Sequence, residues 1–212
     1  MMRSLALFGA GSALAVDVEE SCRRNGINLR VLVRNTEHTA HPDVEAPSIT
    51  LEEITDDLIG TEWLIPLFTP ANRKKAWQHA TSLGLNSFAS LLDASSVYPS
   101  RLSVEEGVYV NSGCTIGACS RLGRFSLINR GCSAGHHLSL GAFSSIGPGA
   151  VLAGEVTIEE EVMIGAGAII LPAVRIGARA RIGAGAVVRK DVPPGALVAA
   201  PDVRVLLRTR TG

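Results

Sequence analysis

The sequence predicts two architectures in one chain, a small α/β domain with a Rossmann-like parallel sheet over residues 1–90 and a parallel β-helix over residues 91–212. The first half alternates short apolar runs with helical segments, which favours parallel strands joined by helices. The second half repeats an aliphatic residue at every sixth position. Aromatic residues make up only 4% of a chain that holds 22 glycines, a composition that suits thin stacked layers.

The first half gives the elements of the α/β domain in order. Three short apolar runs are predicted to be strands: Ser4–Phe8, Leu29–Val33 and Trp63–Phe68. A helix is expected over Ala13–Arg24. A second helix is expected from Pro70 to Leu83, because proline suits the first helical turn and Gly84 follows the last one. The segment Asn35–Ser48, with its histidines, prolines and acidic residues, is predicted to be a loop.

A glycine-rich turn, Gly9-Ala10-Gly11, follows the first predicted strand. Such a turn at the start of a helix suits a phosphate group, so Gly9 and Gly11 are candidate substrate-binding residues. The dinucleotide pattern lacks its third glycine, and no acidic residue is clearly placed after the second strand. A nucleotide-sugar site therefore fits the turn better than a nicotinamide site does.

The repeat of the second half runs without insertion from Val104 to Val188, and Ala134 is its only position without a branched aliphatic residue. Each hexad is expected to form one short strand and one corner, so that three hexads close a triangular coil. Aliphatic side chains then stack on their equivalents eighteen residues away, in coils ~4.8 Å apart. Glycine often follows the aliphatic residue, and we expect it to supply the backbone angles of a tight corner. A small or β-branched residue four places after each aliphatic fills the interior.

His136 lies two residues after Ala134, the one break in the aliphatic ladder. Its equivalents one coil away, Ala118 and Gly154, are small and leave a groove beside the imidazole. A histidine titrates near neutral pH and suits the base that removes a proton from an acceptor during acyl transfer. The alternative is a surface histidine pair, His136 and His137, on a corner.

Motifs of the second half resemble those of hexapeptide-repeat acyltransferases. They are Ile128 to His137, Leu140 to Ser145, Leu152 to Gly154, Leu171-Pro172 and the closing Val187 to Gly195. Within this group, a small α/β domain before the β-helix is similar to the sialic acid O-acetyltransferases and the enzymes that acetylate UDP-linked amino sugars. The resemblance is strongest from about Asn72 onward. It implies a left-handed coil, an exception to the usual crossover hand. It also implies acetyl-CoA as cosubstrate without a metal, a sugar or nucleotide-sugar acceptor in glycan synthesis, and a homotrimer.

The resemblance also assigns roles to residues. It implies that His136 is the general base and that Asn129 lies at the acceptor site. Backbone at Gly154 and Ala184 is expected to contact the pantetheine arm, and Ser145 is a further expected cofactor contact. Asn129 stands where the repeat commonly has glycine, so a plain corner residue is its alternative role.

Two departures from the family pattern stand out. The residue after the catalytic histidine is usually acidic in the family, whereas here it is His137, which orients its neighbour, binds substrate or simply lies at the surface. The glycine-rich turn usually contains a histidine that holds the sugar nucleotide. In this chain the turn from Gly9 to Ala15 has none. The usual UDP-4-amino sugar is therefore expected to be a poor acceptor.

Composition limits the other partners. Twenty basic and twenty acidic residues balance, so no overall charge favours nucleic acid or a membrane surface. The apolar run Leu5–Val16 is too short and too interrupted by glycine to span a bilayer. No signal peptide precedes the four cysteines, which indicates a reducing cytoplasm. Cys114 and Cys132 are eighteen residues apart and are expected to stack in the core.

Two other functions compete with this interpretation. A β-helix metalloenzyme of the carbonic anhydrase kind needs three histidine ligands from neighbouring coils, and the repeat holds only the adjacent His136 and His137. A non-catalytic scaffold fits the unbroken register, but it leaves the histidine pair at the ladder break unexplained. Five basic residues of the last coils either meet coenzyme A phosphates or form a solvated outer face: Arg175, Arg179, Arg181, Arg189 and Lys190. Whether oxygen or nitrogen is acetylated stays open at this stage.

Overall fold

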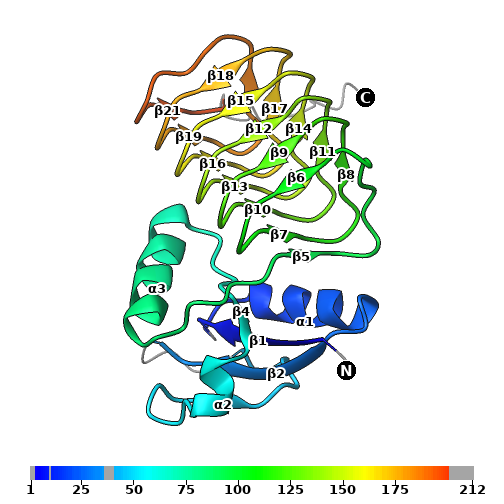
Figure 1. Ribbon diagram of the computed structural model, residues 1–212. Coiled ribbons are helices and arrows are strands. Elements are labelled where there is room, and N and C mark those ends of the chain that lie inside the picture. Colours follow the sequence, from blue (N-terminus) through cyan, green and yellow to red (C-terminus); the bar gives the residue numbers. More distant parts are fainter. Residues whose placement is uncertain (1–2, 10, 36–40, 201–212) are drawn as a thin grey trace, which may run out of the picture.

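The computed structural model describes residues 3–9, 11–35 and 41–200. Ala10 of the glycine-rich turn, residues 36–40 of the predicted loop and residues 201–212 of the predicted β-helix domain lie outside the described residues. A small α/β domain lies at one end of a stack of flat coils (Figure 1).

The α/β domain contains a parallel four-stranded sheet in the order β3-β2-β1-β4. Its elements follow the chain as β1 (Ser4–Phe8), α1 (Leu14–Arg24), β2 (Asn28–Val33), β3 (Ser48–Ile49), α2 (Asp56–Ile59), β4 (Glu62–Leu64) and α3 (Pro70–Ser82). The short helix α2 was not predicted, although Thr55 and two aspartates at its start are a helix-start signal.

Most predicted boundaries lie within one residue of those in the structure, but the end of the third strand was wrong by four residues. The third strand was expected to reach Phe68, but β4 ends at Leu64. Pro66 has no N–H for a strand ladder, and the N–H of Leu67 bonds to the carbonyl of Ile65 at 2.9 Å in a tight turn. The loop expected through Ser48 ends one residue earlier, because Ser48 pairs with Leu32 as the first residue of β3.

The second half forms the predicted coil of two-residue strands. They are β5 (Leu91–Leu92), β6 (Ser103–Val104), β7 (Tyr109–Val110), β8 (Thr115–Ile116), β9 (Arg121–Leu122), β10 (Leu127–Ile128), β11 (Ser133–Ala134), β12 (Ser139–Leu140), β13 (Ser145–Ile146), β14 (Val151–Leu152), β15 (Thr157–Ile158), β16 (Met163–Ile164), β17 (Ile169–Ile170), β18 (Arg175–Ile176), β19 (Arg181–Ile182), β20 (Val187–Val188) and β21 (Leu197–Val198). From β6 to β20 neighbouring strands in each sheet are three places apart in the chain and pair in parallel, so Ile128 meets Ile146 as the repeat predicted.

The strands form three flat sheets, the faces of a triangular prism. We call them face 1 (β5, β7, β10, β13, β16, β19 and β21), face 2 (β8, β11, β14, β17 and β20) and face 3 (β6, β9, β12, β15 and β18). The chain passes from face 1 to face 2 to face 3 and back. Each coil therefore has a 1/2 corner, a 2/3 corner and a 3/1 corner.

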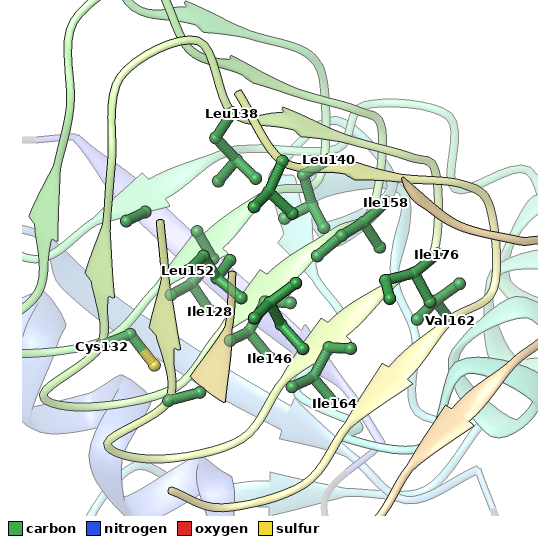
Figure 2. Packing of buried hydrophobic residues seen from close by; sticks show 14 of the residues in the cluster. Ile128, Cys132, Leu138, Leu140, Ile146, Leu152, Ile158, Val162, Ile164 and Ile176 are labelled. Atoms are coloured by element: carbon green, nitrogen blue, oxygen red, sulfur yellow. The ribbon is translucent and has the colours of Figure 1, made fainter. Parts of the chain in front are cut away.

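The interior of the prism is a ladder of aliphatic side chains. Figure 2 shows Ile128, Ile146 and Ile164 of face 1 pointing toward residues of the other faces. Cys114 and Cys132 are free thiols buried in this core, as predicted. Ala134 is buried too, with 4% of its surface exposed, so the break in the ladder lies inside the prism.

The expected reason for the repeated glycines was wrong. A Cβ at Gly117 would lie 2.3 Å from the backbone nitrogen of His136, and one at Gly135 would lie 2.6 Å from that of Gly154. These glycines let successive coils approach closely. Left-handed backbone occurs two positions later in the hexad, at residues such as Cys119 (φ 61°) and His137 (φ 58°).

The α/β domain contacts the first coils of the prism on face 1 and on the 3/1 corner. Helix α1 lies against face 1, where Ser21 Oγ donates to the buried Asp93 at 2.6 Å. Helix α3 lies along the 3/1 corner, where Trp77 packs 5.7 Å from each of the stacked rings of Phe125 and Phe143. The β-helix strands begin at Leu91, and the domain division after residue 90 stays a prediction. No helix among the described residues is long and apolar enough to cross a membrane.

Candidate active site

His136 lies on the 2/3 corner, directly after β11, and its side chain is exposed. The imidazole covers Gly154, one coil above. A Cβ built on Gly154 would come within 2.8 Å of Nε2 and 2.9 Å of Cε1 of the ring. The backbone holds this arrangement, because the N–H of Glu155 donates to the carbonyl of His136 at 2.8 Å. A glycine at residue 154 is therefore needed for the imidazole to lie where it does.

His137 contacts its neighbour through the other ring nitrogen. The two Nδ1 atoms lie 3.0 Å apart, and the rings meet edge to face. One Nδ1 must donate and the other accept. When His137 accepts, His136 carries its proton on Nδ1 and presents the lone pair of Nε2 above Gly154. His137 can thus orient the candidate base, the first of the three roles considered for it. No ion pair links Glu155, one coil above, to His137 within the described ranges.

Asn129 lies on the 1/2 corner of the same coil as His136 and is 8% exposed. Its Oδ1 accepts a hydrogen bond from Asn111 Nδ2 at 3.0 Å and another from the N–H of Arg130 at 2.8 Å. Asp17 of α1 accepts from both Asn111 and Arg130. One chain therefore does not bring Asn129 next to His136, because the two residues occupy different corners of the prism.

The predicted cofactor contacts are divided in the same way. Gly154 is on the 2/3 corner, whereas Ala184 is exposed on the 1/2 corner after β19. The prediction for Ser145 needs correction, because this residue is fully buried on face 1. Its hydroxyl bonds to the carbonyl of Phe68 and accepts from Arg73, so it has no surface to offer a cofactor.

A cavity of about 580 Å³ opens in the α/β domain where β1, β2 and β4 end. Gly9 and Gly11 line it, as expected of a ligand site at the carboxyl ends of parallel strands. Most of the polar lining was not predicted from the sequence: Ser12, Asn35, Thr69, Asn72, Lys75 and His79. The only indication of these residues in the sequence is their position along the chain. Asn35 follows β2, and most of the others belong to the start of α3 and to the side of α3 that faces the cavity.

His79 provides this cavity with the imidazole that the glycine-rich turn lacks. It comes from α3, and its ring packs edge to face on Phe8 at 5.6 Å. Lys75, one helical turn earlier, lines the same cavity. The cavity thus combines two basic side chains with the glycine-rich turn, an arrangement suited to an anionic ligand.

Two further findings concern metals and the outer arginines. Within residues 3–9, 11–35 and 41–200, no group of three or more histidines, cysteines or acidic residues is arranged to hold a metal ion. Arg175, one of the candidates for coenzyme A phosphates, is paired with Glu159. This ion pair favours a role in the outer face for Arg175.

Known proteins share the fold of this chain. The family of bacterial transferase hexapeptide proteins (six repeats) matches residues 155–190. A histidine-to-alanine mutant of GDP-perosamine N-acetyltransferase from Caulobacter crescentus, solved with CoA and GDP-perosamine, superposes with a TM-score of 0.82 at 28% identity over 94% of each chain. No curated protein sequence matches the chain.

Two more structures are similar. The acetyltransferase domain of PglB from Neisseria gonorrhoeae, solved with acetyl coenzyme A, has a TM-score of 0.82 and 25% identity, over 94% of this chain and 97% of that one. WeeI from Acinetobacter baumannii shares the fold, with a TM-score of 0.75 and 20% identity over 97% of this chain and all of its own.

Proposed function

Because the chain is an acyltransferase of the hexapeptide-repeat, left-handed β-helix family, we propose that it transfers the acetyl group of acetyl-CoA to an amino group of a nucleotide sugar. The observation that carries this proposal is the imidazole of His136, which presents Nε2 over the glycine at residue 154. The choice of nitrogen over oxygen follows the N-acetyltransferase to which the chain is similar.

In the proposed reaction His136 is the general base. Nε2 takes a proton from the acceptor nitrogen as that nitrogen attacks the thioester carbonyl, and the C–S bond breaks to release the CoA thiolate. The proton on His136 then passes to the thiolate. His137 keeps the Nδ1 proton of His136 in place by accepting it in a 3.0 Å hydrogen bond, so that Nε2 stays available as the base.

We propose that the acceptor binds in the cavity of the α/β domain. Gly9, Gly11, Lys75 and His79 line it, and the two basic side chains suit the phosphates of a sugar nucleotide. The site of reaction must then be near this cavity. The cavity belongs to the domain that packs on face 1, whereas His136 lies on the 2/3 corner, which is opposite face 1 in a triangular prism. We infer that an acceptor in the cavity reacts at the His136 of another chain.

A homotrimer resolves this conflict. The outward side chains of face 2 include Val97, Val151, Ile169 and Val187, which are between 39% and 62% exposed. Three copies with face 2 around a threefold axis would cover this apolar surface. Each 2/3 corner would then meet the 1/2 corner of the next chain. His136 and Gly154 of one chain would face the corner that carries Asn129 and Ala184 in its neighbour.

The test measures free thiol release from acetyl-CoA with a panel of UDP-, GDP- and dTDP-linked amino sugars. We expect turnover with at least one of them, and poorer kcat/KM on the UDP-4-amino sugar, because the imidazole of this cavity comes from His79 of α3 and not from the turn between Gly9 and Ala15. Acetyl-CoA should also raise the melting temperature. Acetyl-CoA binding without transfer to any amino or hydroxyl acceptor would overturn the proposal, and no binding would favour a scaffold. We further propose that the enzyme acts in the cytoplasm, because the four cysteines are free thiols.

A further inference from the structure

Arg73 of α3 is a buried cation whose hydrogen-bond partners are all neutral. It is 1% exposed, and burial lowers the pKa of its guanidinium to about 9. Within the described part of the chain it forms no ion pair with a carboxylate. Its partners are backbone carbonyls and one hydroxyl: Nε donates to Phe125 O at 2.7 Å, Nη1 to Leu67 O and Phe68 O, and Nη2 to Phe143 O, Ser144 O and Ser145 Oγ. Burying a charge without an anion is costly, so this cluster needs an explanation.

The partners of Arg73 belong to two different parts of the molecule. Leu67 and Phe68 line the acceptor cavity in the α/β domain. Phe143 and Ser144 follow β12 and lie on the same coil as His136, and Phe125 lies one coil below. The guanidinium therefore joins a wall of the cavity to the coil that carries the candidate base.

The residues after Arg73 strengthen this connection. Lys74 Nζ contacts Glu161 Oε1 at 2.6 Å, one coil above the coil of His136. Lys75 lines the cavity. One turn of α3 thus attaches to three successive coils and presents a basic side chain to the ligand.

We propose that Arg73 is a positioning residue that holds the Leu67–Phe68 wall of the acceptor cavity level with the coil of His136. This inference rests on the proposed function, in which the cavity holds the acceptor. In a trimer of parallel prisms, equivalent coils lie at the same height. A cavity fixed to the height of its own His136 is then also at the height of the neighbour's His136, which would perform the reaction.

Arginine suits this task better than lysine. Its planar fork offers five N–H donors in fixed directions, whereas an ammonium offers three donors from one point. In Arg73→Lys some of the buried carbonyls lose their partner and the wall moves relative to the coil. A shift of about 1 Å at a reacting centre can cost ~100-fold in rate.

The experiment compares two acceptors in Arg73→Lys and Ser145→Ala. One is the best nucleotide sugar of the panel, and the other is hydroxylamine, a small nucleophile that needs no cavity. We expect kcat at saturating nucleotide sugar to fall by roughly 10- to 100-fold in Arg73→Lys and by about 3-fold in Ser145→Ala. Acetyl transfer to hydroxylamine and the Kd of acetyl-CoA should change less than about twofold. Gln78→Ala, an exposed change on the same helix, is the matched control.

The other outcomes of this experiment would reject the positioning role of Arg73. Equal losses with both acceptors, or a lower melting temperature with unchanged kcat, would mean that Arg73 is merely structural. If Arg73→Lys does not fold, Ser145→Ala decides alone, and an unchanged ratio of the two activities overturns the inference. Lys75→Gln separates this result from a failure of the proposed acceptor site. An unchanged KM for the nucleotide sugar in Lys75→Gln would mean that the acceptor binds elsewhere. A raised KM in Lys75→Gln together with wild-type kinetics in Arg73→Lys would reject only the role of Arg73.

Discussion

At the scale of single residues, the candidate base depends on the pair His136 and His137. When His137 accepts the Nδ1 proton of His136 across their 3.0 Å contact, Nε2 of His136 is the nitrogen that can take a proton. We predict that His136→Ala lowers kcat by roughly 10²–10⁴-fold, the usual contribution of a general base. The Kd of acetyl-CoA should barely change, because the expected cofactor contacts are backbone ones. Stopped-assay kinetics and calorimetry check both values, and wild-type turnover in this variant would remove His136 from the mechanism.

Gly154 provides a second test at this scale. A methyl group there would lie 2.8 Å from His136 Nε2, and its nearest atoms belong to that movable ring. We predict that Gly154→Ala folds normally but displaces the imidazole, so that kcat falls by about 10-fold or more. Gly60→Ala is the matched control, because its methyl group would meet no atom closer than 3.9 Å. Equal activity of the two variants would show that the ring orientation does not matter for turnover.

At the scale of the element, the corner glycines decide whether coils can stack. A methyl group at Gly135 would lie 2.6 Å from the nitrogen of Gly154 and 2.7 Å from the carbonyl carbon of Ala153, both backbone atoms that cannot move aside. We predict that Gly135→Ala lowers the free energy of unfolding by about 1–3 kcal/mol, the typical cost of overpacking. Urea unfolding measures it. A variant as stable as Gly154→Ala would contradict the close-approach explanation.

The same scale shows what a sequence can and cannot predict. The hexad register from Val104 to Val188 was readable because every strand uses the same rule, with an inward aliphatic residue that repeats at fixed spacing. The role of the corner glycines was not readable, because it depends on backbone eighteen residues away. Arg73 was missed for a similar reason. Its partners Phe125 and Phe143 lie 52 and 70 positions along the chain, and the helix that carries it gives no local signal of burial.

At the scale of the whole molecule, the outward residues of face 2 are expected to form the trimer contact. Ile169 is 39% exposed and lies between Val151 and Val187 on this face. We predict that Ile169→Glu yields monomers in light scattering and abolishes nucleotide-sugar acetylation, because three carboxylates would meet near the threefold axis. Thr157→Glu, on the outer side of face 3, is the control and should remain trimeric. A trimeric and active Ile169→Glu would require another contact surface.

The positions of the predicted site residues are explained only at the level of the whole molecule. Asn129, His136, Gly154 and Ala184 were proposed from local motifs, and each motif fixes only the corner on which its residue lies. The fold assigns them to two different corners. A single sequence contains no signal that two distant corners meet, because in the proposed trimer that contact is made between chains.

The last prediction tests the shared site by mixing two inactive variants. His136→Ala lacks the base, and Lys75→Glu carries a reversed charge in the acceptor cavity. If each site takes His136 from one chain and the cavity from the next, a site is intact only where a Lys75→Glu chain precedes a His136→Ala chain around the ring. Every mixed trimer has one such junction out of three and should then regain about one third of wild-type activity. Co-expression with two affinity tags yields these mixed trimers for the thiol-release assay, and the separately prepared homotrimers give the baseline. If the site lay within one chain, every subunit of the mixture would carry a defect, and activity would stay at that baseline.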